Sequence, residues 1–270
     1  MGKITKLLEN IEDSKIGFRK TETNKSFKSE VDLSLPEIKL GDIDPKFVVY
    51  HDPESFSAEN FKILRSQILH PRTGLPSRFI LVTSAVPQEG KTYIAINLAF
   101  SFARSVPTIL IETDLRRPSF THFLGINPEK GLADYLLKKC ALSDIVLKTD
   151  YDNLFLVSSG SNYKDIKDVF SSEKMVNFLE DLRRTFSGFF FIFDSAPLMV
   201  ASETISLSRL VDGVLFVVRY AFSDRDIVGE ALEKIGRSKL LGFVFNSYSP
   251  SVLGLFSPKL KHVKYIYQNH

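Results

Sequence analysis

The sequence predicts an α/β fold in which a mostly parallel β-sheet is flanked by helices. Three observations carry this prediction. The segments that favour strands are apolar throughout and do not alternate with polar residues, which indicates burial on both faces of a parallel sheet. They alternate along the chain with helical patterns, as strand–helix–strand units do. A Gly-Lys-Thr sequence also joins the first of these strands to a helix, which is typical of phosphate-binding loops.

The expected elements follow one another from residue 79 onward. We expect strands at 79–84, 108–112, 154–157, 189–194, 213–218 and 241–246, and helices at 90–104, at 172–186 and from Ser223 onward. The apolar residues of the 172–186 helix recur at the spacing of one helix face. The Ser-Asp-Arg-Asp sequence at Ser223 is suited to a helix N-cap.

The chain divides into three predicted regions. Residues 1–47 comprise a short amphipathic helix, with Ile4, Leu7, Leu8 and Ile11 on one stripe, and a polar linker. The amphipathic stripe could dock on a partner or on the protein's own surface. Residues 48–250 form the α/β domain, which is long enough for a substantial core. Residues 251–270 form a tail that contains Tyr265 and Tyr267.

Composition narrows the range of functions. The net charge of +3 is too small to indicate a nucleic-acid partner by itself. Cys140 is the only cysteine, so no internal disulfide can form and a reducing compartment is favoured. No apolar run approaches the roughly 18–20 residues of a membrane span, and the N-terminus lacks the apolar core of a signal peptide. We therefore expect a cytoplasmic protein without a transmembrane segment.

The segment that joins the first strand to its helix predicts a nucleotide-binding loop. It consists of Ala85, Val86, Pro87, Gln88, Glu89, Gly90, Lys91 and Thr92. Backbone N–H groups of such a loop, with the helix N-terminus behind them, face a polyphosphate. Lys91 would reach the outer phosphates and Thr92 would bind Mg²⁺. Ala85 occupies the position where the usual motif has its first glycine.

Carboxylates follow two of the predicted strands at their C-terminal ends. Glu112 ends the 108–112 strand and Asp114 comes two residues later, and Asp194 ends the 189–194 strand. Because C-terminal ends of parallel strands share one edge, these groups should converge with Lys91. Phosphoryl transfer needs such a set: a cation on the phosphates, a carboxylate that holds Mg²⁺, and a carboxylate that orients or deprotonates the acceptor hydroxyl. The pattern therefore predicts an enzyme that uses ATP and Mg²⁺.

Several motifs together resemble the bacterial tyrosine kinase (BY-kinase) family of capsule and exopolysaccharide biosynthesis, of the CpsD/CapB type. They are Glu-Gly-Lys-Thr at 89–92, Ile-Leu-Ile-Glu-Thr-Asp-Leu-Arg-Arg-Pro at 109–118, Gly-Leu-Ala-Asp-Tyr-Leu at 131–136 and Phe-Ile-Phe-Asp-Ser-Ala-Pro at 191–197. The resemblance extends over about residues 50–250. It places the fold among P-loop NTPases of the MinD/ParA-like superfamily.

The resemblance also implies roles for individual residues. Lys91 contacts phosphate, Thr92, Asp114 and Asp194 hold Mg²⁺, Glu112 activates the tyrosine hydroxyl, and Asn246 lies against adenine. Glu59, Lys62 and Arg65 match the helix through which subunits of the family form rings, although their spacing alone indicates only a solvated charged face. Tyr265 and Tyr267 correspond to the phosphoacceptor tail.

The family further implies an autokinase that regulates polysaccharide synthesis and export. It implies a membrane adaptor that governs chain length, a cognate tyrosine phosphatase, and a position at the inner face of the plasma membrane through a partner.

Two departures from the family pattern bear on catalysis. Glu112 replaces an aspartate, which moves the carboxylate outward by roughly 1.5 Å, so Glu112→Asp is expected to increase activity. Gln88 replaces a glycine, so a side chain lies where the backbone approaches phosphate. Two other functions remain open: a MinD/ParA-like ATPase switch, disfavoured because Val86 stands where that class has a second lysine, and an ATP-binding scaffold with weakened catalysis.

Overall fold

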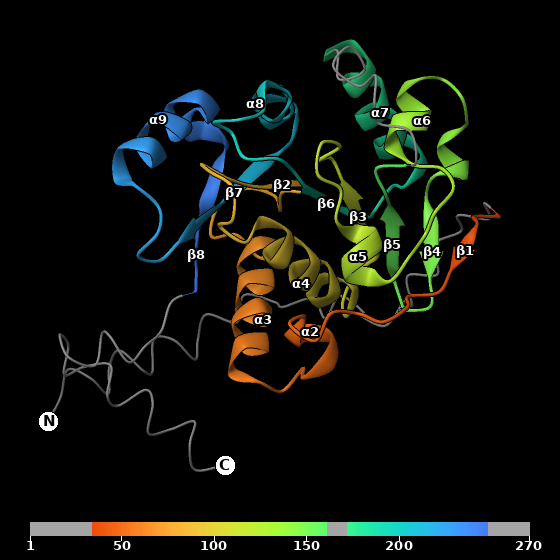
Figure 1. The fold of residues 1–270 in the computed structure, drawn as a ribbon, viewed down its shortest axis with the longest axis horizontal. Helices are drawn as coiled ribbons and strands as arrows, with labels where there is room; N and C mark the ends of the chain where they lie inside the picture. The colour runs from red at the N-terminus through yellow and green to blue at the C-terminus, as the bar shows by residue number, and fades with distance from the viewer. Residues whose placement is uncertain (1–33, 161–171, 248–270) are drawn as a thin grey trace, which may run out of the picture. The chain divides into compact units, whose positions relative to one another are not determined.

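The computed structural model describes residues 34–160 and 172–247, which form an α/β unit around one eight-stranded sheet (Figure 1). The strand order is β1-β4-β5-β3-β6-β2-β7-β8. The strands span Glu37–Ile38 (β1), Phe79–Ser84 (β2), Thr108–Glu112 (β3), Leu147–Thr149 (β4), Leu154–Val157 (β5), Phe190–Asp194 (β6), Gly213–Arg219 (β7) and Leu240–Asn246 (β8). Every neighbouring pair is parallel except β4 and β5, which are antiparallel.

The central strands are apolar because helices cover both of their faces. Every residue of β2, β3 and β6 is buried. Side chains that alternate along these strands pack into two separate layers, and Ile80, Val82, Leu110 and Ile192 belong to the same hydrophobic cluster as the α4 side chains. This confirms the prediction of a mostly parallel sheet between helical layers.

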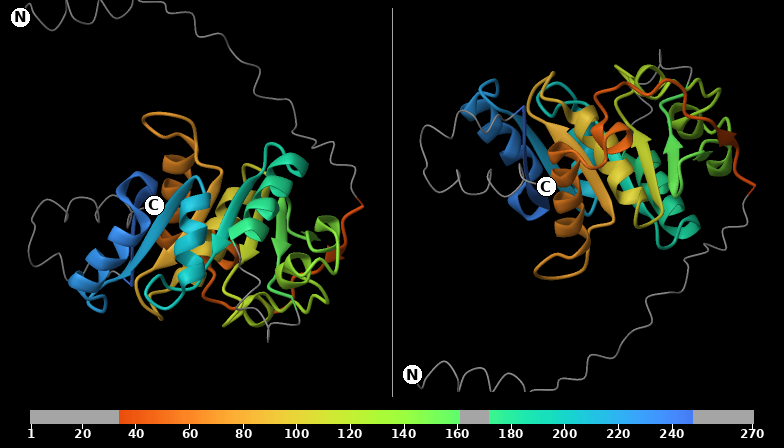
Figure 2. Two further views of the ribbon diagram at one scale, coloured as in Figure 1. Left: turned by 90° about the horizontal axis from the view of Figure 1, so that it is seen from above. Right: turned by 90° about the horizontal axis from the view of Figure 1, so that it is seen from below.

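The helices divide between the two faces of the sheet. They span Val48–His51 (α2), Phe56–Leu69 (α3), Lys91–Ala103 (α4), Phe120–Leu124 (α5), Leu132–Leu136 (α6), Ser172–Thr185 (α7), Ser202–Leu210 (α8) and Arg225–Ile235 (α9). Helices α2–α5 lie on one side, and α7, α8 and α9 lie on the other, as Figures 1 and 2 show. The side chain of Asp224 caps the N-terminus of α9, one residue beyond the predicted start at Ser223.

The chain enters the fold earlier than its sequence pattern indicates. Residues 34–47, assigned to the linker from sequence, contain β1, which pairs with β4. Ile43 and Phe47 are buried, and the amide of Gly41 donates to the carbonyl of Leu124 at 3.0 Å. A strand of two residues has no periodicity for sequence reasoning to detect. The predicted N-terminal helix and the tail lie outside the described residues.

Each helix in the described ranges falls short of the length and apolar character that crossing a membrane requires.

Candidate nucleotide and phosphoryl-transfer site

The predicted phosphate loop lies between the end of β2 and the start of α4. Gly90 is the N-cap of α4 and has φ 93°, a left-handed conformation that glycine adopts without strain. Lys91 begins α4 and is 9% exposed. Gln88 also has a positive φ, 66°, which costs a residue with a Cβ about 1–2 kcal/mol. The loop therefore has the left-handed geometry expected where the family has glycine, and this chain reaches it with a glutamine.

Side chains at the end of β7 and in the segment between β7 and α9 contact this loop and hold it in place. The Glu89 side chain is fully buried, and its Oε2 accepts from the amide of Val86 at 2.8 Å. Its Oε1 accepts from the hydroxyl of Ser223. Arg219 donates from Nη1 to the carbonyl of Gln88 at 3.2 Å. No contact with the loop was predicted for either residue: Arg219 follows the predicted 213–218 strand directly, and Ser223 was expected only to begin the next helix.

Asn246, the last residue of β8, also contacts the loop. Its Nδ2 donates to the carbonyl of Glu89 at 2.9 Å, and its Oδ1 accepts from the amide of Ser247 at 2.9 Å. Gly90 lies so close that a Cβ there would be 2.0 Å from Nδ2. Both polar groups of the Asn246 amide thus have protein partners, and the side chain holds the loop. Its predicted contact with adenine stays a prediction.

Asp194 and Thr92 have the oxygen atoms that Mg²⁺ requires. Thr92 Oγ1 donates to Asp194 Oδ2 at 2.7 Å, while Asp194 Oδ1 is buried and has no hydrogen-bond partner among the described residues. The described residues contain no group of three or more His, Cys, Asp or Glu that could hold a metal alone. This pair nevertheless fits Mg²⁺, because the ion is usually bound through one or two carboxylates together with substrate phosphates and water.

The electrostatics of Asp194 are also suited to binding a cation. Burial raises the pKa of Asp194 to about 7, with smaller upward contributions from Glu112 and Asp114 and opposing contributions from Lys91 and Thr92. Burial likewise raises the pKa of Asp114, and Lys91 opposes this effect. Carboxylates whose charged forms are disfavoured beside one buried lysine are suited to bind a further positive charge.

The two carboxylates at and just after the end of β3 have different surroundings. Glu112 lies directly beside Asp194 in the β3–β6 register and is 1% exposed. Its oxygens accept hydrogen bonds from the amides of Ser119, Phe120 and Ser159. Asp114 is half-buried, and its Oδ1 accepts from the amide of Arg117 at 3.1 Å. The structure thus brings Lys91, Asp114 and Asp194 within electrostatic reach of one another and ties Glu112 to backbone.

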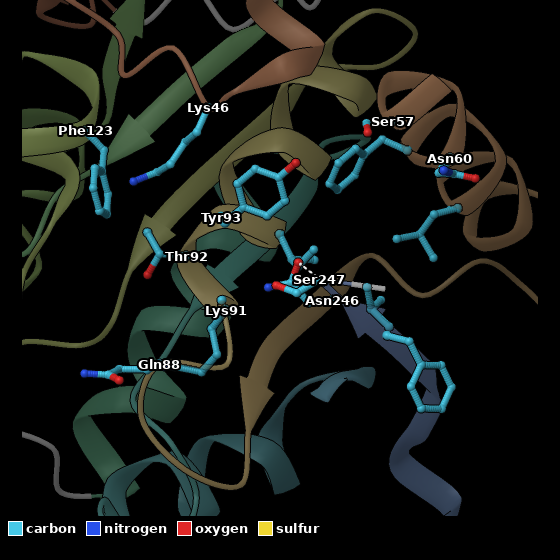
Figure 3. Close-up of a pocket in the computed structure, with 16 residues that line it drawn as sticks. Lys46, Ser57, Asn60, Gln88, Lys91, Thr92, Tyr93, Phe123, Asn246 and Ser247 are labelled. Carbon is cyan, nitrogen blue, oxygen red and sulfur yellow. Dashed lines mark hydrogen bonds between the residues drawn. The ribbon is translucent and has the colours of Figure 1, made fainter. Parts of the chain in front are cut away.

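A pocket of about 700 Å³ opens beside the loop, which is large enough for a nucleotide. It is lined by Lys46, Ser57, Asn60, Phe61, Leu64, Gln88, Gly90, Lys91, Thr92, Tyr93, Ile94, Phe123, Val244, Phe245, Asn246 and Ser247. Figure 3 shows Lys46 and Phe123 on one side, Ser57 and Asn60 on the other, and Tyr93 between them. Lys46 adds a second cation, whose Nζ lies 2.9 Å from Asp44 and 3.4 Å from the centroid of the Phe123 ring. Lys46 was not predicted as a site residue because it lies in the predicted linker.

The predicted oligomerisation residues lie on α3. Lys62 forms ion pairs with Glu59 at 3.1 Å and with Glu54 at 3.7 Å. Arg65 instead donates from Nη1 to the carbonyl of Ser101 in α4, at 2.5 Å. Arg65 therefore fastens α3 to its own domain, whereas the side chains of Glu59 and Lys62, which are 46% and 26% exposed, pair with each other. Tyr265 and Tyr267 lie outside the described residues.

The parallel sheet, the strand–loop–helix with Lys91, and the carboxylates at neighbouring strand ends define a P-loop nucleotide-binding protein. No protein-family model matches the chain. Individual proteins do. The chain is 31% identical over 180 residues to the tyrosine-protein kinase CpsD of Streptococcus pneumoniae, a match that covers 65% of this chain and 78% of CpsD. The chain belongs to the family of bacterial tyrosine-protein kinases that includes CpsD.

A second relative is much longer than this chain. The succinoglycan biosynthesis transport protein ExoP of Rhizobium meliloti is 29% identical over 233 residues, which cover 84% of this chain but 29% of ExoP. Only a part of ExoP therefore corresponds to the chain.

Solved structures agree with the assignment. The crystal structure of the chimerical protein CapA2B2 has a TM-score of 0.68 and 26% identity, and the match covers 80% of this chain and 96% of that one. The cell-division ATPase MinD of Pyrococcus furiosus has a TM-score of 0.55 and 22% identity, with 64% and 73% covered. The similarity to MinD is one of fold alone.

Proposed function

We propose that this chain transfers the γ-phosphoryl group of ATP to tyrosine hydroxyls, beginning with its own tail, and thereby regulates capsular or exopolysaccharide synthesis and export. The observation that supports this most strongly is the set formed by Lys91, Asp114 and Asp194, which lies at the C-terminal edge of the sheet beside a nucleotide-sized pocket. A cation on the phosphates and carboxylates near the transferred group are what phosphoryl transfer requires.

In this proposal each residue of the chain has one task. The backbone N–H groups of Gln88, Glu89 and Gly90 and the N-terminus of α4 receive the phosphates, and Lys91 neutralises charge on their outer oxygens. Thr92 and Asp194 would hold Mg²⁺, which neutralises charge on the phosphate oxygens when bound. Asp114 orients the acceptor hydroxyl in this proposal, a task that differs from the Mg²⁺ contact that the family resemblance implies.

The partners follow from the same proposal. A membrane protein that determines polysaccharide chain length would bring the chain to the inner face of the membrane, and a cognate phosphatase would reverse the modification. Subunits would associate in a ring through α3, with Glu59 and Lys62 at the contact, and Tyr265 and Tyr267 would be the acceptors.

The test incubates the full chain with ATP and Mg²⁺ and identifies phosphotyrosine by mass spectrometry, alone and with the cytoplasmic end of a chain-length adaptor. Phosphate on Tyr265 or Tyr267 supports the proposal. Label that persists in the Tyr265→Phe/Tyr267→Phe variant would place the acceptor elsewhere. Intact ATP binding without phosphotyrosine under either condition would contradict the kinase function and favour a scaffold.

A further inference from the structure

The turn that carries Asp114 is closed by the side chain of Glu112. Glu112 is the last residue of β3, and α5 begins at Phe120 after its N-cap, Ser119. Glu112 Oε1 accepts from the amides of both Ser119 and Phe120, the latter at 2.8 Å. One carboxylate oxygen therefore joins the two ends of the 113–118 turn.

The second oxygen of Glu112 fastens the turn to a neighbouring strand. Oε2 accepts from the amide of Ser159 at 3.1 Å. Ser159 follows β5, which pairs with β3. A buried backbone N–H that loses its hydrogen-bond partner destabilises the fold around it. Three backbone donors thus depend on one side chain that is almost fully buried.

The side chains of Asp114 and Asp194 accept fewer hydrogen bonds from backbone amides than that of Glu112. The Asp114 side chain accepts from the amide of Arg117 and interacts with Lys91. Asp194 Oδ1 has no hydrogen-bond partner among the described residues. Thr113 completes the anchoring of Asp114, because its amide and its hydroxyl both donate to the carbonyl of Asp194, at 2.8 and 2.7 Å.

We propose that Glu112 is a positioning residue: it closes the 113–118 turn and thereby holds Asp114 in place, and Asp114 orients the acceptor hydroxyl. This inference rests on the kinase function proposed above. It assigns to Glu112 a role different from the hydroxyl activation expected from sequence. An aspartate at 112 would withdraw the carboxylate by roughly 1.5 Å, which breaks contacts that are now 2.8–3.1 Å long. Glu112→Asp is therefore expected to loosen the turn and lower activity, the opposite of the increase expected from the family pattern.

Kinetics of three variants test this role at a temperature below all of their unfolding midpoints. Glu112→Gln keeps an oxygen for Ser119 and Phe120, so we expect kcat to fall about tenfold or less, while Glu112→Asp should fall further. KM for ATP should stay unchanged in both variants, because the phosphates contact the loop after β2. Asp114→Asn should lose about a hundredfold or more in kcat. Glu173→Asp, at an exposed glutamate of α7, is the matched control.

Three kinetic outcomes would overturn the proposal. If kcat fell further in Glu112→Gln than in Glu112→Asp, Glu112 would be acting as a general base. An unchanged kcat in both Glu112 variants, with lower melting temperatures, would show a role in stability alone. Wild-type kcat in Asp114→Asn would remove the residue that Glu112 is proposed to position.

Amide hydrogen exchange separates this inference from the kinase function, because it requires no phosphoryl transfer. In the full-length Glu112→Asp variant, the amides of Ser119, Phe120 and Ser159 should exchange about tenfold faster or more than in wild type, as local opening becomes easier. The Glu173→Asp control should show wild-type exchange at these amides. Unchanged protection in Glu112→Asp would overturn the inference even if the kinase is active, and faster exchange would support it even if no phosphotyrosine forms.

Discussion

Asp194→Asn should stabilise the protein in the absence of nucleotide and Mg²⁺, although it removes a proposed metal ligand. Burial raises the pKa of Asp194 from 3.8 to about 7, so folding favours its neutral form. The stability that comes from the neutral form is present below about pH 3.8 and is lost as pH rises through about 7. This difference of about three pH units corresponds to about 4 kcal/mol, at about 1.36 kcal/mol per unit.

Asparagine resembles the neutral acid at every pH. The stability of Asp194→Asn relative to wild type should therefore increase as pH rises. Between about pH 5 and pH 8 it should increase by about 2–3 kcal/mol, which is roughly 5–10 °C in melting temperature for a domain of this size. The assay is thermal unfolding of both proteins in EDTA at the two pH values. Asp152→Asn, at an exposed carboxylate of the β4–β5 turn, should leave the melting temperature unchanged.

Mg²⁺ and ATP should reverse this ranking. A ligand that binds only the folded state stabilises it in proportion to the logarithm of its concentration over Kd, and the variant should lose most of this stabilisation. A variant that melts below wild type at both pH values, or a gap that does not change with pH, would refute the reasoning from the buried charge.

Two glycine predictions form a matched pair. Gly90→Ala should abolish ATP binding and lower the melting temperature, because φ is 93° and the new Cβ would meet Asn246 Nδ2 at 2.0 Å; wild-type binding by isothermal titration would contradict this. Gly229→Ala, at an exposed position in α9 with nothing within 4 Å, should raise stability by about 0.5–1 kcal/mol; a loss in denaturant unfolding would count against the described helix.

The sequence predicted the central sheet because its strands bury both faces. In β2, β3 and β6 burial leaves continuous apolar runs that are visible without a structure. It did not predict β1 and β4, which have two and three residues, because such lengths contain no period. Helices α5 and α6, with five residues each, were missed for the same reason.

The site was predictable where chemistry coincides with a strand end. Lys91 and Thr92 follow from the Gly-Lys-Thr sequence, and Asp194 follows from its position at the end of β6. The direction of a side chain does not follow in the same way. Glu112 is also at a strand end, yet its carboxylate contacts backbone that lies seven, eight and 47 residues further along the chain.

The contacts that Arg219 and Ser223 make with the phosphate loop could not be predicted from local sequence patterns. Ser223 meets Glu89 across 134 residues, and Arg219 meets Gln88 across 131. Neither contact has a periodic or motif signal, because each depends on how β7 lies beside β2.

The partition of ATP-derived phosphate tests the central claim most directly. The full chain is incubated with γ-labelled ATP and Mg²⁺, and label in phosphotyrosine is compared with label released as inorganic phosphate, for wild type and for Lys91→Met. A tyrosine kinase of this site should place label on tyrosine in wild type and lose about a hundredfold or more in Lys91→Met. Phosphate release that depends on Lys91, with no label on tyrosine, would contradict the account and identify an ATPase switch.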